Sequence, residues 1–183
     1  MFLPGKNIYL RSLDHSDASI LYKWENDKNV WKVSNTQAPF TKEQIRNFVS
    51  SQQDIYTEKQ LRLMICIPPG KTLVKKEEGN TGERCGCVDL FDFDPHHLRA
   101  GVGILVSDKY KRNGYASEAL SILITHCFKK MNLYQLYCNI AEDNKASLNL
   151  FKKHKFKITG KKKDWVRTSK NYLDEYTLQL INR

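Results

Sequence analysis

The chain has 183 residues, of which 40% are hydrophobic and 27% charged, a composition typical of one globular domain. It contains no apolar run of the ~20 residues that a membrane span needs, and its first residues lack the pattern of a signal peptide. We therefore expect a single domain covering residues 1–183, a cytoplasmic location and no membrane partner. The net charge of +10 suits a polyanionic cofactor, although the lysine runs at 152–155 and 161–163 are also typical of a solvated face.

The five cysteines are odd in number and lie mostly within apolar patterns. Cys85 and Cys87 form a C-x-C pair rather than C-x-x-C, and no second pair follows at zinc-binding spacing. The pattern therefore predicts reduced core thiols and no metal site.

In the first half of the chain, the pattern predicts a strand at residues 7–13 followed by two helices. Asp14 supplies a capping oxygen before the first helix, and Thr41 and Gln44 form a capping box at the second. A β-favouring apolar run predicts a strand at 61–67. The glycines and prolines of residues 68–82 then indicate a long hairpin connection rather than a domain boundary.

In the second half, strands and helices alternate. Apolar runs predict antiparallel strands at 85–93 and 100–106, with residues 85, 87, 89, 91 and 93 on one face of the first. Helical periodicity predicts helices at 116–130 and 144–154 with a strand at 133–140 between them, and strands near 162–168 and 173–181 end the chain. The order β-α-α-β-β-β-α-β-α-β-β combines an antiparallel meander with one strand–helix–strand crossover, which is an α+β fold.

The segment from Tyr110 to Ser117 joins a buried strand to the clearest helix of the sequence. A helix start presents unpaired amides and the positive end of the helix dipole, and both favour a bound phosphate. Gly114 lets an anion approach the backbone closely, and Lys111 and Arg112 add positive charge. The segment is neither a Walker loop nor G-x-G-x-x-G. It predicts an anion site of another kind, with an ordinary turn as the alternative.

A second motif follows the next strand, where Asn144, Ser147 and Phe151 recur along a helix. Asn144 is either an ordinary helix cap or, with Ser147, a group that faces a cofactor between the two strands. Together, K-R-N-G-Y-A at 111–116 and N-x-x-S-x-x-L-F at 144–151 resemble the motifs of the GNAT superfamily of acyl-CoA N-acyltransferases. The resemblance is to the branch of ribosomal-protein N-terminal acetyltransferases and spermidine acetyltransferases. Stretches at 24–27 and 170–174 are similar to other motifs of that branch, so the resemblance spans nearly the whole chain.

This resemblance implies a mixed, mostly antiparallel central sheet flanked by helices, with the fourth and fifth strands splayed around acetyl-CoA. It implies that the strand before the loop bonds the pantetheine arm, that the loop amides hold the pyrophosphate, and that the second motif flanks the thiol end. The residues implied to bind the co-substrate are Ile104, Leu105, Val106, Lys111, Arg112, Asn113, Gly114, Tyr115, Ala116, Ser117, Asn144, Ser147, Phe151 and Lys153.

Acetyl transfer requires a neutral amine, so a base or a site that lowers the pKa of the amine is needed. Our candidates for the base, in order, are Asp89, Asp92, His97 and Asp174. Asp89 leads because it interrupts an apolar strand face, although an edge-exposed carboxylate would give the same pattern. His97 is more typical of a turn.

The chain departs from the resembled branch at two chemically important positions. Gly101 stands where the branch often has a glutamate, and Phe151 stands where many members have a tyrosine thought to protonate the leaving thiolate. Trp24, Trp31 and Phe40 are candidates for the wall of an acceptor pocket, with core packing preferred for Trp24.

The predicted function is an N-acetyltransferase that moves an acetyl group from acetyl-CoA to a primary amine by direct attack in a ternary complex. A protein amino terminus, an amino sugar and a small amine all fit as acceptor, and a polyamine fits less well. The alternative, suggested by Gly101 and Phe151, is a non-catalytic acyl-CoA sensor of the same fold. Nucleic acid is not an expected partner because no recognised motif for it is present. We expect a monomer or homodimer.

Overall fold

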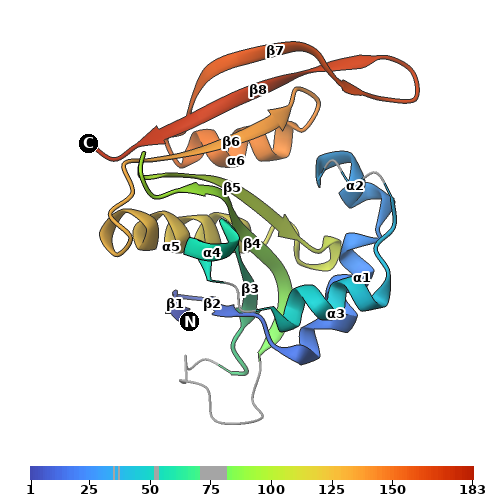
Figure 1. The fold of residues 1–183 in the computed structure, drawn as a ribbon, viewed down its shortest axis with the longest axis vertical. Coiled ribbons are helices and arrows are strands. Elements are labelled where there is room, and N and C mark those ends of the chain that lie inside the picture. The colour runs from blue at the N-terminus through green and yellow to red at the C-terminus, as the bar shows by residue number, and fades with distance from the viewer. Residues whose placement is uncertain (35, 37, 52–53, 71–81) are drawn as a thin grey trace.

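The computed structural model describes residues 1–34, 36, 38–51, 54–70 and 82–183, and its centre is one open sheet of eight strands (Figure 1). The strands are β1 (Phe2–Pro4), β2 (Tyr9–Ser12), β3 (Leu61–Ile67), β4 (Glu83–Asp94), β5 (Arg99–Val106), β6 (Gln135–Ala141), β7 (Lys157–Arg167) and β8 (Tyr172–Ile181). The helices are α1 (Ala18–Glu25), α2 (Lys28–Ser34), α3 (Lys42–Ser50), α4 (Ile55–Glu58), α5 (Tyr115–Lys129) and α6 (Lys145–Lys153).

The strands lie in the order β1-β2-β3-β4-β5-β6-β8-β7, and every pair of neighbours is antiparallel except β5 with β6. The parallel pair is joined by α5, which is the one strand–helix–strand crossover that the sequence predicts. The mixed, mostly antiparallel sheet flanked by helices is therefore confirmed. β3 and β4 pair as a hairpin, as expected, while residues 71–81 of their connection lie outside the described residues.

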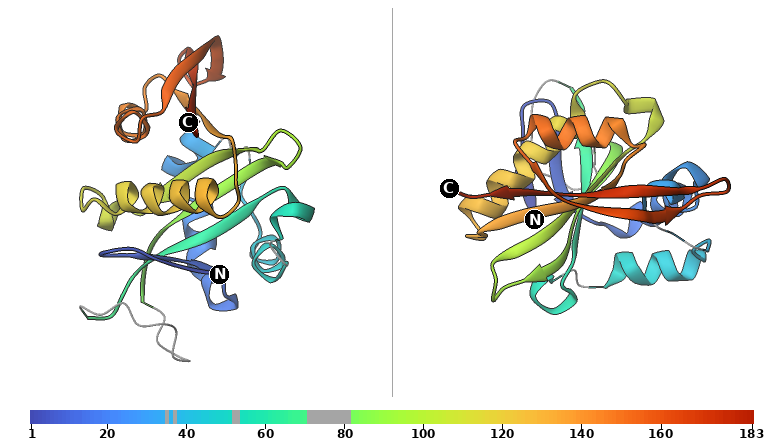
Figure 2. Two further views of the ribbon diagram at one scale, coloured as in Figure 1. Left: turned by 90° about the vertical axis from the view of Figure 1, so that its left-hand side faces the viewer. Right: turned by 90° about the horizontal axis from the view of Figure 1, so that it is seen from above.

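Helices cover both faces of the sheet, and Figure 2 shows α3 and α5 on opposite sides. On one face, α5 and α6 bury residues such as Leu120 and Phe151 against strand residues such as Leu63 and Val88. On the other face, α1 and α3 pack on a smaller cluster of Tyr9, Leu21, Ile45, Val49, Met64 and Cys66. Alternation along β3 places Leu63 and Met64 in opposite clusters, as the period of a strand requires. Trp24 packs against the smaller cluster, which confirms core packing for it.

Near its end, β4 departs from the regular alternation that the sequence predicts. The pairing with β5 is irregular between Phe91 and Asp94, and Asp92 has a φ of 47°. This bulge turns Phe93 to the face of Leu90, where it joins the larger core. The expectation that Phe93 shares a face with Phe91 is therefore wrong.

Four further elements differ from the sequence-based expectation. β1, α2 and α4 were not predicted because they are only three, seven and four residues long, too short for a reliable periodic signal. β7 begins at Lys157 rather than near residue 162.

All five cysteines are free and buried, as expected. None of the helices in the described ranges is long and apolar enough to cross a bilayer.

The ring of Phe91 on β4 leaves no space for a side chain at Gly101. A β-carbon built at Gly101 would lie 2.2 Å from the ring of Phe91, which covers the glycine. The ring also meets Tyr137 edge-on, with centroids 5.8 Å apart. At Gly103, a β-carbon would meet nothing nearer than 3.6 Å. The space that a longer side chain would need at position 101 is thus occupied by Phe91.

Replacing this glycine tests the packing. We expect Gly101→Ala to lower the free energy of unfolding by about 1–3 kcal/mol, because the added methyl group overpacks the contact with Phe91. The matched control Gly103→Ala should change stability little, and adding Phe91→Leu to Gly101→Ala should recover part of the loss. Denaturant unfolding of the variants measures both effects. Equal losses from the two alanine substitutions would contradict the packing.

Candidate active site

The sheet opens at its centre because β5 and β6 separate. They pair only from Arg99 with Gln135 to Gly101 with Tyr137, while β5 continues to Val106 and β6 to Ala141. Each strand stays paired with its outer neighbour over its length, β5 with β4 and β6 with β8. The splay predicted for the fourth and fifth strands is therefore present. These two strands are β5 and β6 because β1 was not predicted, and their separation leaves two backbone edges facing a gap.

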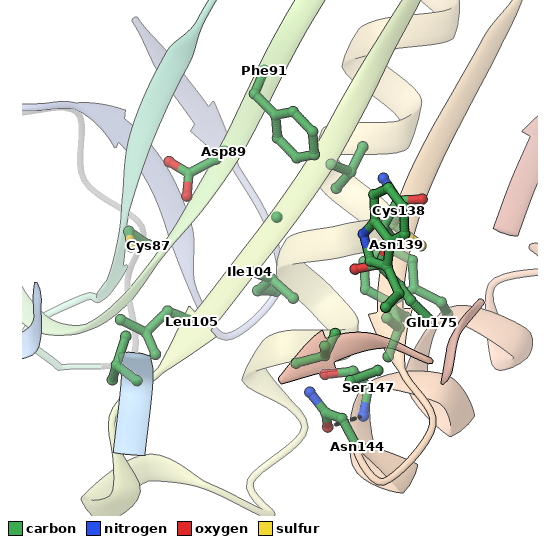
Figure 3. Close-up of a pocket in the computed structure, with 18 of the residues that line it drawn as sticks. Cys87, Asp89, Phe91, Ile104, Leu105, Cys138, Asn139, Asn144, Ser147 and Glu175 are labelled. Atoms are coloured by element: carbon green, nitrogen blue, oxygen red, sulfur yellow. Dashed lines mark hydrogen bonds between the residues drawn. The ribbon is translucent and has the colours of Figure 1, made fainter. Parts of the chain in front are cut away.

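A cavity of about 520 Å³ occupies this gap. Figure 3 shows Cys87 and Asp89 of β4 on one side of β5, and Asn139 of β6 and Glu175 of β8 on the other. The lining also includes Ile104 and Leu105 of β5, Cys138 of β6, Asn144, Ser147 and Phe151 of the α6 region, and Glu25, Arg62, Lys162 and Trp165. Because these residues come from both faces of the sheet, the cavity passes through the gap between the strands.

The loop before α5 presents unpaired amides, as the sequence predicts. Arg112 and Gly114 adopt left-handed φ angles of 65° and 82°, and the helix begins at Tyr115. Among the described residues, no acceptor is bonded to the backbone N–H groups of residues 112–117, whereas those of Lys111 and Glu118 are bonded to Asp108 and Gly114. A β-carbon at Gly114 would meet nothing within 4 Å. The loop is thus open to an incoming anion.

The side chains of this loop make local contacts. Lys111 lies 2.5 Å from Asp108, and Asn113 donates to the carbonyl oxygen of Tyr110 at 3.2 Å. Ser117 Oγ and His154 Nε2 share a hydrogen bond of 2.9 Å, which joins α5 to the end of α6. Burial and the nearby charge of Lys153 lower the pKa of His154, so its imidazole is neutral at pH 7. Residues 111–117 and Lys153 do not line the cavity described above; they lie beside it at the helix ends.

The second motif forms a helix cap at the wall of the cavity. Asn144 Oδ1 accepts from the amide of Ser147 at 3.1 Å, so Asn144 caps α6, and both residues also line the cavity (Figure 3). Phe151 lines the cavity as well and packs edge-on against Phe156, with centroids 5.0 Å apart. Of the strand residues implied to bind the co-substrate, Ile104 and Leu105 line the cavity and Val106 does not.

On the α1–α3 side of the cavity, two carboxylates hold one guanidinium. Arg62 Nε donates to Asp89 Oδ1 at 2.6 Å, and Arg62 Nη1 donates to Glu25. The guanidinium also lies over the ring of Phe48, 5.3 Å from its centroid. Asp89, the leading candidate for the base, is thus in the cavity, and its charge is partly neutralised by Arg62.

The other predicted bases have partners outside the cavity. Asp92 accepts from the hydroxyl of Tyr137 at 2.9 Å on an exposed bulge. Asp174 lies 2.5 Å from Lys161 and accepts from the amide of Asp164 at 2.9 Å. The ion pair with Lys161 and this backbone bond lower the pKa of Asp174. Neither aspartate lines the cavity.

His97 is likewise engaged elsewhere, because its imidazole is 2.8 Å from Asp94 in the β4–β5 turn. Glu175, beside Asp174, is the carboxylate that faces the cavity. It is 5% exposed and lies 2.8 Å from the Lys162 ammonium.

Sequence reasoning missed several polar residues of the cavity, namely Glu25, Arg62, Cys138, Asn139, Lys162 and Glu175. Glu25 belongs to the W-E-N-D stretch at 24–27, so the family resemblance pointed to its neighbourhood. Glu175 alternates with Asp174 along β8, and only the register with Ala141 of β6 shows which of the two faces inward.

Glu118 fixes the start of α5 to the N-terminal segment. Its carboxylate accepts from the amides of Lys6, Asn7 and Ile8, the Asn7 amide at 2.7 Å, and from Asn7 Nδ2 at 2.8 Å. Burial alone would raise the pKa of Glu118, but these donors lower it below its ordinary value. The contact holds the first turn of α5, and with it the unpaired amides, against the β1–β2 turn.

A parallel strand pair that splays around a cavity, beside a helix start with unpaired amides, is the α+β arrangement that the family resemblance implies. A model of the acetyltransferase (GNAT) domain matches residues 7–157. The chain therefore belongs to the GNAT acetyltransferase family, and it is an N-acetyltransferase.

Individual relatives agree with this assignment. The chain is 26% identical to the uncharacterized N-acetyltransferase p20 of Bacillus licheniformis over 182 residues, which cover 99% of this chain and 96% of that protein. It is structurally similar to the ribosomal L7/L12 acetyltransferase RimL in complex with coenzyme A, with a TM-score of 0.81, 18% identity and coverage of 99% and 98%. Spermidine N-acetyltransferase of Vibrio cholerae, in complex with CoA and spermine, gives a TM-score of 0.80, 16% identity and coverage of 96% and 95%.

The contacts of Glu118 predict a pH-dependent loss of stability. We expect Glu118→Gln to lower the free energy of unfolding by about 1–3 kcal/mol at pH 7, since its charge-assisted bonds to the amides of residues 6–8 and to Asn7 Nδ2 are weakened. The matched control Glu43→Gln also removes a first-turn carboxylate, at α3, and has no such donors. Because the folded pKa of Glu118 is depressed, its contribution is present above the unfolded pKa and is lost as the pH falls through the folded value. Denaturant unfolding should show the gap between wild type and Glu118→Gln closing below about pH 4.5, near the unfolded pKa of glutamate. A pH-independent gap would contradict this role.

Proposed function

We propose that the protein transfers the acetyl group of acetyl-CoA to a primary amine in a ternary complex, with residues 1–183 acting as one domain. The observation that carries the proposal is the combination of a through-sheet cavity with unpaired amides at residues 112–117 beside it. The amides offer hydrogen-bond donors to a diphosphate, and the cavity has room for a thioester.

The co-substrate side is the face that carries α5 and α6. The pyrophosphate lies at the amides of residues 112–117, where the α5 dipole adds a favourable field. Lys111, Arg112 and Lys153 supply charge for the phosphates. The pantetheine arm follows the free edge of β5 at Ile104–Val106, and its thiol end meets the residues of the second motif, Asn144, Ser147 and Phe151. The backbone at Leu105–Val106 offers a donor to the developing oxyanion.

The acceptor enters from the face of α1 and α3. The amine nitrogen attacks the thioester carbonyl carbon, the C–S bond breaks, and CoA leaves as the thiolate. The amine must lose a proton before or during attack. Asp89 is the member of the predicted set that lines the cavity, and Glu175 is a second carboxylate there. We propose that these two carboxylates bind the ammonium form and receive its proton, while Asp92 and Asp174 act outside the reaction.

The leaving group requires little help. Phe151 has no proton to donate, yet a thiolate is a good leaving group because a thiol has a pKa of about 8.5. Lack of a tyrosine at this position therefore does not argue for the non-catalytic sensor. That alternative predicts thermal stabilisation by CoA with no thiol release in the presence of any amine, and such a result would overturn the proposal.

The pyrophosphate loop is tested by a pair of glycines with the same backbone conformation. Gly114 has a φ of 82° and Gly70 a φ of 78°, and no atom of the described residues lies within 4 Å of a β-carbon built at either glycine. Alanine at either position should cost about 1–2 kcal/mol of stability through its left-handed conformation. Only Gly114→Ala should also raise the KM for acetyl-CoA, by roughly ten-fold or more, because a methyl group then faces the phosphates. Steady-state kinetics measures the KM, and an equal KM in both variants would reject the loop as the site.

The proposed proton acceptors are tested by substituting the carboxylates in the cavity and comparing them with nearby carboxylates outside it. Asp89→Asn and Glu175→Gln should each lower kcat, toward the roughly 10²-fold that loss of a general base costs. The controls Asp174→Asn and Asp92→Asn should retain kcat within a factor of about two, since these groups lie outside the cavity. Thiol release across a panel of amines measures kcat. A large loss of kcat in Asp174→Asn with none in Glu175→Gln would show that Asp174, and not Glu175, is the proton acceptor on β8.

A further inference from the structure

A second cavity of about 480 Å³ adjoins the first on the α1–α3 side of the sheet. The two cavities share the lining residues Glu25, Arg62, Asp89 and Phe91. Because the two cavities share these four residues as a common wall, they lie next to each other on this side of the sheet. The second cavity therefore bears on which amine the enzyme accepts.

The wall of the second cavity is mainly apolar. Its hydrophobic lining residues are Phe40, Ile45, Phe48, Leu61, Leu90 and Phe91, and Gln44 and Gln60 add neutral amides. Within the described part of the chain, its charged lining residues are the shared Glu25, Arg62 and Asp89. A pocket of this size and composition suits an apolar or aromatic group.

The charges at the common wall fit a single ammonium group. Arg62 is held between Glu25 and Asp89, so the three side chains carry a net charge of −1. A second ammonium farther into the second cavity would meet the rings of Phe40 and Phe48 and neutral amides, and the described lining residues offer no further carboxylate to pair with it. Placing an unpaired charge there would be costly.

We propose that the acceptor is a singly charged primary amine whose neighbouring carbons carry an aromatic or bulky aliphatic group, and that this group lies in the second cavity. The inference rests on the proposed function and names the acceptor class of the same site. The amine faces the thioester between β5 and β6, near Asp89 and Glu175, while the apolar group lies against Phe40, Phe48 and Phe91. The same chemistry occurs in a free arylalkylamine and in the first residue of a peptide.

The experiment compares amines that differ in this group, in charge, or in being part of a peptide. Thiol release from acetyl-CoA is measured with 2-phenylethylamine, n-butylamine, spermidine and a peptide that begins with phenylalanine. We expect kcat/KM for 2-phenylethylamine to exceed that for n-butylamine by about ten-fold or more, and spermidine to be the poorest substrate, since burial of the ring is the added interaction. The ratio between 2-phenylethylamine and the peptide distinguishes a free amine from a polypeptide amino terminus.

Two variants connect the preference to the cavity. Phe40→Ala should lower the ratio of kcat/KM between 2-phenylethylamine and n-butylamine by about five-fold or more, and Gln60→Trp, which fills the cavity from an exposed position, should do the same. The matched control Tyr56→Ala removes an exposed aromatic ring outside both cavities and should leave the ratio unchanged.

The outcomes separate this inference from the function on which it rests. Equal or faster turnover of n-butylamine or spermidine, or a ratio that neither Phe40→Ala nor Gln60→Trp alters, would overturn the inference and leave the acetyltransferase function standing. Absence of thiol release with all four acceptors would overturn both.

Discussion

The structure depends on the loss of pairing between β5 and β6 after Gly101 and Tyr137. Each strand keeps its outer partner, so the gap lies between two parts of the sheet that are both paired up to its edges. Unpaired strand edges inside a protein are costly unless another group satisfies their N–H and C=O groups. In the proposed function the amide groups of the pantetheine arm satisfy them, so the weak point of the sheet serves as the site for the co-substrate.

The position of α5 follows from the same opening. The helix joins the two diverging strands, and its first turn stands beside the cavity with free amides at residues 112–117. The first turn of α5 is held in place by contacts with other segments. Glu118 attaches it to the N-terminal segment, and the bond between Ser117 and His154 attaches it to α6. Contacts distant in sequence thus place a local anion-binding geometry at the correct end of the gap.

Much of this arrangement was predictable from the sequence where the signal is local. The periodicity of α5, the left-handed glycine before it and the cap of α6 all appear in short windows, and the family resemblance implied the splay. The inward-facing residue of β8 was not predictable, because Asp174 and Glu175 are adjacent and only pairing with β6 separates them. The ion pairs of Arg62 with Glu25 and Asp89 join three elements, so no local pattern reveals them. Phe93 was misplaced because a bulge at Asp92 interrupts the strand period.

Phe91 connects the missing glutamate at position 101 with the apolar character of the acceptor side. Its ring covers Gly101, where the resembled branch often has a carboxylate, and it lines both cavities. An aromatic ring in that place removes a charge and adds apolar surface next to the gap. The net negative charge is instead supplied by Glu25 and Asp89, two carboxylates that share the one guanidinium of Arg62. A site altered in this way keeps an attraction for one ammonium group while favouring an apolar substituent beside it, since burial of that substituent against Phe91 contributes to binding.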